Sequence, residues 1–130
     1  MMTPLLCLVT AMFFEARNQS ITGMEMVAEV IMNRVEHPSF PDTVCDVVYE
    51  RKQFSFANEG HASMYDYQEP EDRMARYTAL GVALRYLQGD RLGSTSTHYH
   101  KTTVSPEWKY EFVLDGKVED HIFYTCYENC

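Results

Sequence analysis

The sequence has little positive charge and no apolar run long enough to cross a membrane. Its 130 residues include 11 Lys and Arg against 19 Asp and Glu, which gives a net charge of −8 at pH 7. Gripping nucleic acid or an anionic lipid surface requires clustered basic side chains, which this composition does not supply. The longest apolar stretch covers residues 5–14, well short of the roughly twenty residues of a bilayer-crossing helix. We therefore expect no nucleic-acid binding and no stable membrane association.

A targeting leader and closely paired cysteines are missing as well. Residues 1–3 contain no Lys or Arg, and no small-x-small cleavage site follows the apolar stretch. No Cys-x-x-Cys pair occurs among Cys7, Cys45, Cys126 and Cys130. In a chain without a signal peptide, buried reduced thiols are the default, although a Cys126–Cys130 link stays open. We expect free thiols and synthesis in a reducing cytoplasm.

The hydrophobic content is that of a folded domain. Hydrophobic residues make up 45% of the chain, too many for a disordered protein, and 130 residues leave no room for two independent cores. We expect a single domain over residues 1–130 and a monomer. Nine Tyr, seven Phe and one Trp would suit a site that stacks on sugars or flat rings.

Helical signals occupy the first two thirds of the chain. Thr3 and Pro4 have the residue types of an N-cap and a first helical position. Capping-box spacing from Thr22 to Glu25 opens a second helix, with apolar residues at 3.6-residue periodicity. Residues 52–67 lack steady periodicity and indicate a functional loop. Helices are predicted from 3 to 17, from 22 to a stop at Pro38, over a short turn at 43–49, and from 70 to 89.

Beyond Gly93 the pattern changes to β-structure. Residues 95–100 and 108–114 are β-prone, and Asp115-Gly116 is a hairpin signal before a third β-prone segment at 118–124. The predicted fold class is therefore α+β, mainly α, with a small antiparallel β-sheet near the C-terminus.

Glu15 is the first candidate for chemistry. On a helical wheel it lies about 20° from Leu8, on an apolar face. Desolvation of a carboxyl group there would raise its pKa and keep its proton near neutrality, as a general acid for glycosidic cleavage requires. The alternative, weighted equally from the wheel, is that Glu15 pairs with Arg17 or Arg34 or caps the next segment.

Two other acids near the second helix are weaker candidates. Glu25 is better explained as the capping-box partner of Thr22. Glu29 belongs to a polar strip and is expected to be solvated or paired. Neither gives a convincing second carboxylate.

His98 and His100 alternate on a predicted strand, so both rings should point to one face. Together with His121 or Cys126 they could build a zinc site, but no His-Glu-x-x-His or paired-Cys motif supports it. Histidine and tyrosine side chains that line a cleft and bind a polar ligand are the favoured interpretation.

A polar and aromatic alternation follows the short third helix. Gln53, Ser55 and the rings of Phe54 and Phe56 would supply amide, hydroxyl and stacking contacts for a carbohydrate. The alternative, which is compatible with this one, is a loop pinned by two buried Phe rings.

Taken in order, these segments resemble the SleB/CwlJ-type cell-wall hydrolase family. Order and spacing are kept over nearly the whole chain. The matching elements are Phe14-Glu15-Ala16-Arg17, Gly23 with Val27-Ala28 and Val30, Asn33-Arg34-Val35, residues 40–49, Gln53-Phe54-Ser55-Phe56, Thr97-His98-Tyr99-His100, Pro106-x-Trp108 and His121-x-Phe123-Tyr124.

The resemblance implies a lysozyme-like fold of goose type or lytic-transglycosylase type that acts on peptidoglycan glycan strands without a metal or other cofactor. Glu15 would protonate the glycosidic oxygen after N-acetylmuramic acid. Its conjugate base would then help the muramic C6 hydroxyl attack C1, leaving a 1,6-anhydro end, whereas water in that role would make the enzyme a muramidase. The substrate contacts expected on this basis are Gln53, Phe54, Ser55, Thr97, His98, Tyr99, His121 and Tyr124.

One position departs from the resembled pattern. Relatives commonly have Glu-Ala-Arg-Gly-Glu, and this chain has Gln19 at the second acid. An amide cannot act as base or nucleophile. A one-acid transglycosylase tolerates that loss, so the departure favours this mechanism.

The expected biological setting follows from the missing leader and wall-binding domain. A bare catalytic domain fits a phage endolysin, stored in the cytoplasm and released to the wall by a holin, and we favour this interpretation. The alternatives are a leaderless spore-cortex germination hydrolase of the same fold, a catalytically inactive wall-binding protein, and a zinc amidase.

Overall fold

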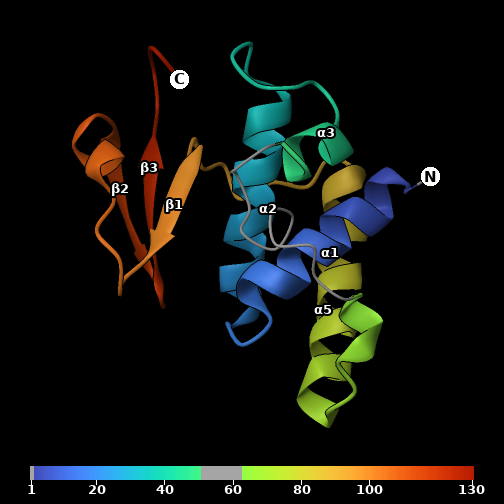
Figure 1. Cartoon of the computed structure of the whole chain (residues 1–130). Coiled ribbons are helices and arrows are strands. Elements are labelled where there is room, and N and C mark those ends of the chain that lie inside the picture. The colour runs from blue at the N-terminus through green and yellow to red at the C-terminus, as the bar shows by residue number, and fades with distance from the viewer. Residues whose placement is uncertain (1, 51–62) are drawn as a thin grey trace.

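The computed structural model describes residues 2–50 and 63–130, and it is a helical layer with a small sheet beside it (Figure 1). The helices are α1 (Pro4–Ala16), α2 (Ile21–Val35), α3 (Val44–Val48) and α5 (Pro70–Leu87). The strands are β1 (His98–Lys101), β2 (Val113–Val118) and β3 (His121–Thr125), and two 3-10 turns are η1 (Met64–Asp66) and η2 (Glu107–Tyr110). The predicted α+β class, mainly α, is confirmed.

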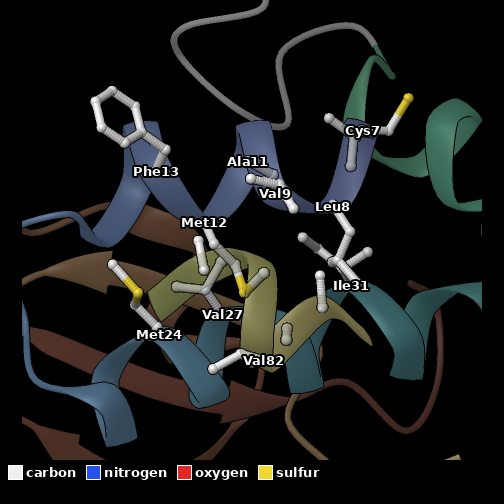
Figure 2. Packing of buried hydrophobic residues seen from close by; sticks show 14 of the residues in the cluster. Cys7, Leu8, Val9, Ala11, Met12, Phe13, Met24, Val27, Ile31 and Val82 are labelled. Atoms are coloured by element: carbon white, nitrogen blue, oxygen red, sulfur yellow. The ribbon is translucent and has the colours of Figure 1, made fainter. Parts of the chain in front are cut away.

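Helix α1 is the central element of the core. The hydroxyl of Thr3 accepts a hydrogen bond from the Leu6 amide at 3.1 Å, and Pro4 occupies the first turn, as predicted. Because α1 is apolar on nearly every side, it is buried among the other helices. Figure 2 shows Leu8 and Met12 directed towards α2, and they share one hydrophobic cluster with Val27 and Ile31 of that helix.

The N-cap of helix α2 lies two residues before the predicted one. Its N-cap is Ser20, whose hydroxyl accepts the Gly23 amide at 3.3 Å. The predicted capping box is wrong because Thr22 already lies inside the helix, and Glu25 instead forms an ion pair with Arg85 at 3.2 Å. The two hydroxyl residues compete for one helix start, and spacing alone did not decide between them.

The polar strip of α2 holds the chain segment that leads into the sheet. Glu29 is fully buried rather than solvated, and its carboxylate accepts the amides of Leu92 and Ser94, each at 2.9 Å. Asn33 donates to two carbonyls of this segment, and the Arg34 Nε donates to the Thr97 carbonyl at 2.7 Å. These bonds fix where β1 begins relative to the helices.

The sheet is antiparallel with strand order β1-β3-β2. The predicted hairpin turn at Asp115-Gly116 is wrong: these residues lie within β2, at an irregularity in its pairing with β3. The Asp115 carboxylate accepts hydroxyl hydrogen bonds from Ser96 at 2.7 Å and Thr125 at 2.6 Å, which ties the bulge to its neighbours. The chain reverses instead at residues 119–120.

Trp108 was expected on a strand and lies in η2. The predicted free thiols are also wrong: Cys7 and Cys45 form a disulfide that was not foreseen, and the Cys126–Cys130 link that was left open is formed. Packing of α3 against α1 brings the Cα atoms of the first pair within 5.3 Å, a proximity that their separation in sequence did not reveal.

In the described ranges, no helix combines the length and apolarity needed to cross a membrane.

Candidate active site

A cleft of about 620 Å³ lies between the end of α1 and the sheet. One wall is the last turn of α1 and the loop into α2, and the other is the end of β1, the residues after it and the β2–β3 turn. The lining residues are Phe14, Glu15, Arg17, Asn18, Gln19, Lys101, Thr102, Thr103, Asp120 and His121.

Of the two carboxyl groups that the described residues bring to the lining of this cleft, Glu15 is the more buried. Its Oε1 accepts a hydrogen bond from the Tyr99 hydroxyl at 2.8 Å. Burial raises the pKa of Glu15 above its ordinary value, and the Tyr99 bond and the charge of Lys101 offset part of that rise. The predicted desolvation is confirmed. The alternative partners are engaged elsewhere, because Arg17 faces Asp72 at 3.8 Å and Arg34 binds the Thr97 carbonyl.

Tyr99 determines which oxygen of the Glu15 carboxyl group carries the proton. Burial, followed by the neighbouring Glu15, raises the pKa of Tyr99 well above its ordinary value, so the phenol keeps its proton and acts as a donor. A phenol that donates to Oε1 leaves Oε2 as the better place for the carboxyl proton. Tyr99 therefore selects the oxygen from which Glu15 can give its proton.

His121 and Lys101 complete this side of the cleft, where the register of β1 and β3 pairs them. The His121 side chain is 2% exposed, its ring centroid lies 4.9 Å from that of Tyr99, and no described residue bonds its buried Nδ1. Burial, followed by the charge of Lys101, lowers the pKa of His121, while Asp120 and Glu119 act in the opposite direction. The His121 imidazole beside Tyr99 is therefore neutral at neutral pH.

Other predicted site residues lie on the opposite face of the sheet. His98 and His100 do share one face, as predicted, because both rings contact Trp108. The Nε2 of His100 lies 2.8 Å from the Tyr124 hydroxyl, and burial lowers the pKa of His98 to about 4. The sheet separates the Glu15 cleft from this aromatic cluster, which consists of His98, His100, Trp108 and Tyr124.

The zinc set considered from the sequence is not assembled. His121 lies on the Tyr99 face, away from His98 and His100, and Cys126 is in a disulfide. Across residues 2–50 and 63–130, no three His, Cys, Asp or Glu side chains form a metal-binding group.

Thr97 is a structural residue rather than a cleft residue. It is 2% exposed, its hydroxyl accepts the Cys126 amide at 2.9 Å, and its carbonyl accepts from Arg34. Gln53, Phe54 and Ser55 lie outside the described residues, so their predicted substrate contacts stay predictions.

Sequence reasoning missed Lys101, Gln19 and Asp120 as cleft residues. Lys101 follows Tyr99 by two residues on a strand, so the alternation that placed the histidines could have placed it as well. Asp120 comes from a turn that was predicted at the wrong position. Gln19 was noted only for the acid it replaces.

The model of the cell wall hydrolase family matches residues 18–124 of this chain. The chain belongs to the cell wall hydrolase family. The matched range begins three residues after Glu15.

The chain is 30% identical over 114 residues to a spore cortex-lytic enzyme of Halalkalibacterium halodurans, and 29% identical over 117 residues to one of Bacillus cereus. These alignments cover 87% and 89% of this cell wall hydrolase but only 32% and 42% of the relatives, so it spans well under half of their length.

Two solved catalytic domains have the same fold as this cell wall hydrolase. The catalytic domain of the germination-specific lytic transglycosylase SleB from Bacillus anthracis has a TM-score of 0.75 at 26% identity and covers 94% of this chain and 93% of its own. That of Bacillus cereus SleB has a TM-score of 0.74 at 25% identity, with coverages of 94% and 89%. The lysozyme-like fold implied by the resemblance is confirmed. These relatives are spore cortex-lytic enzymes and SleB catalytic domains, and they give no support to the phage endolysin interpretation.

Proposed function

We propose that this protein cleaves peptidoglycan glycan strands as a lytic transglycosylase, with Glu15 as the general acid and base. The observation that carries the proposal is a desolvated carboxyl group, held by a phenol, at the wall of a polar cleft. A carboxyl group with a raised pKa keeps a proton to give to a leaving oxygen. The SleB catalytic domains of this fold, one of them named a lytic transglycosylase, support the same assignment.

In the proposed reaction, Glu15 gives its proton to the oxygen between N-acetylmuramic acid and N-acetylglucosamine. The bond from that oxygen to C1 breaks, and its electron pair stays on the departing sugar. The Glu15 carboxylate then takes the proton of the muramic C6 hydroxyl as its oxygen attacks C1. The 1,6-anhydro ring closes and Glu15 is protonated again, so no water is consumed.

We place the substrate in the spore cortex rather than in a vegetative wall attacked by a phage, because the similar full-length proteins are spore cortex-lytic enzymes. We also propose that the protein is made in the cytoplasm and acts on the wall after release. Its two disulfides would form outside the cytoplasm, where thiols are not kept reduced.

The decisive experiment digests purified sacculi and cortex fragments with the wild-type protein and with Glu15→Gln. The wild type is expected to release muropeptides with anhydro-muramic ends, identified by mass spectrometry. Glu15→Gln should lower the rate by at least about a hundredfold, because a positioned acid contributes roughly 10²–10⁴.

Glu111→Gln, an exposed carboxyl group outside the cleft, is the matched control and should keep the wild-type rate. Circular dichroism and a sacculus-binding assay would show that Glu15→Gln still folds and binds. Full lysis by Glu15→Gln would refute the role of Glu15. Binding by the wild type without any release of soluble fragments would favour the non-catalytic wall-binding alternative.

A further inference from the structure

The β2–β3 turn is fastened to the loop between α1 and α2. The Gln19 Nε2 donates to the Asp120 Oδ2 at 3.0 Å, and the Asp120 amide donates back to the Gln19 Oε1 at 3.3 Å. Beside it, the Ser20 amide donates to the Glu119 Oε1 at 2.9 Å, and the Ser20 hydroxyl bonds the same oxygen. We call these four residues the turn contact. It joins the two walls of the cleft across about a hundred residues of sequence.

Tertiary contacts impose the shape of this turn. Glu119 has a φ of 50°, in the left-handed region that residues other than glycine seldom adopt. Position 23 must be glycine for the two walls to meet, because a Cβ there would lie 2.7 Å from the Gln19 Cβ and 3.1 Å from the Glu119 Oε1. The turn contact therefore holds the Asp120 carboxylate at one place on the rim of the cleft.

We propose that Asp120 is the second carboxylate of the active cleft, where it serves as the base for an attacking water, and that Gln19 is its positioning residue. This inference rests on the proposed function. Glu15 and Asp120 line the same cleft in opposite environments, one partly buried against a phenol and the other exposed and held by an amide. Two carboxyl groups in unlike environments are the arrangement that divides acid and base roles in glycoside cleavage.

An amide at position 19 is what this arrangement needs. The Gln19 side chain donates to the carboxylate with one atom and accepts the turn amide with the other. A glutamate at position 19 would have no proton to donate and would face the carboxylates of Asp120 and Glu119.

The step that Asp120 serves competes with closure of the anhydro ring. Glu15 protonates the glycosidic oxygen, and the C1–O bond breaks with its electron pair on the departing sugar. A water oxygen then attacks C1 while the Asp120 carboxylate accepts the water's proton, which leaves a reducing muramic end. Asp120 loses that proton to solvent and Glu15 regains one. The protein is therefore expected to form reducing ends alongside anhydro ends.

The test is the ratio of reducing to anhydro muramic ends, measured by mass spectrometry on digested sacculi. Asp120→Asn keeps an oxygen for the Gln19 amide but cannot take a proton. We expect it to lower reducing-end products at least about tenfold, while anhydro products stay within about twofold of wild type. Gln19→Ala keeps Asp120 but frees its carboxylate, so reducing ends should fall severalfold. Glu111→Gln is the matched control and should leave the ratio unchanged.

An unchanged ratio in Asp120→Asn would overturn the proposal and leave Asp120 as a structural partner of Gln19. A wild-type protein that forms only anhydro ends would also overturn it, and would leave the assignment of Glu15 intact. Thermal unfolding of each variant checks the fold. If Asp120→Asn does not fold, the ratio in Gln19→Ala decides, because loss of positioning predicts a change and a purely structural role does not.

Discussion

At the scale of single residues, the environment of a side chain could be predicted from the sequence where nearby residues create it. It could not be predicted where residues far along the chain create it. Glu15 could be identified as a desolvated carboxyl group because its neighbours on one helix face are set by local periodicity. The burial of Glu29 could not be foreseen, since its two amide donors come more than sixty residues later. Asp120 could not be placed in the cleft because its partner, Gln19, is about a hundred residues away.

The phenol of Tyr99 should control the pH range in which Glu15 holds its proton. Its hydrogen bond lowers the pKa of Glu15, so Tyr99→Phe removes that effect and raises the pKa further. Activity that needs protonated Glu15 should then persist to higher pH, with the basic limb of the rate profile displaced upward. The maximal rate should fall about tenfold, because neither carboxyl oxygen is then selected for the proton.

The pH dependence of kcat on soluble glycan fragments measures both effects of Tyr99→Phe. Tyr110→Phe, an exposed ring on η2, is the matched control. A basic limb that stayed in place or moved to lower pH would contradict the assigned role of Tyr99.

At the scale of elements, local signals located the helices well and the strands less well. Caps and prolines act within one turn, and they correctly gave the start of α1 and of α5. The hairpin was misplaced because Asp115 bonds Ser96 and Thr125 rather than closing a turn. The start of α2 was missed because Ser20 and Thr22 are both suitable N-cap residues, and spacing alone does not decide between them.

Two glycines on helices should respond in opposite ways to alanine. Gly23→Ala gains up to about 1 kcal/mol of helix propensity, but its Cβ would strike the Gln19 Cβ. Overpacking of this kind costs roughly 1–3 kcal/mol, so we expect net destabilisation and a weakened turn contact. Gly81→Ala on α5 meets nothing within 4 Å and should stabilise the protein by about 1 kcal/mol.

Urea unfolding of the two glycine variants gives both free energies directly. A Gly23→Ala protein as stable as Gly81→Ala would show that the walls of the cleft can separate without cost. It would then remove the structural basis for a fixed Asp120.

At the scale of the whole molecule, the helices and the sheet are joined by long-range links. Asn33 and Arg34 on α2 hold the approach to β1, and the turn contact joins the α1–α2 loop to the β2–β3 turn. The cleft exists only because these links place the end of α1 beside the end of β1. Length and composition predicted one folded domain, and nothing in them indicated where its two parts would meet.

The two disulfides should differ in their effect on stability. Cross-linking lowers the entropy of the unfolded chain more when the closed loop is longer. For the 38-residue separation of Cys7–Cys45, that model gives about 4 kcal/mol, against about 2 kcal/mol for the separation of 4 in Cys126–Cys130. Replacing the first pair by alanine should therefore destabilise the protein more than replacing the second.

Guanidinium unfolding of the two double-alanine variants compares the disulfides under one condition. A greater loss on removing Cys126–Cys130 would contradict the loop-entropy argument. It would instead point to native contacts around Thr97, whose hydroxyl accepts the Cys126 amide.

The sequence by itself determined the starts of α1 and α5, the shared face of His98 and His100, and a carboxyl group at position 15 that water reaches poorly. These properties arise from periodicity and capping over a few residues. Tertiary structure decided the disulfides, the place of the chain reversal before β3, and the presence of Asp120 in the Glu15 cleft. Those features depend on contacts between distant segments, whose geometry exists only once the helices and the sheet have packed together.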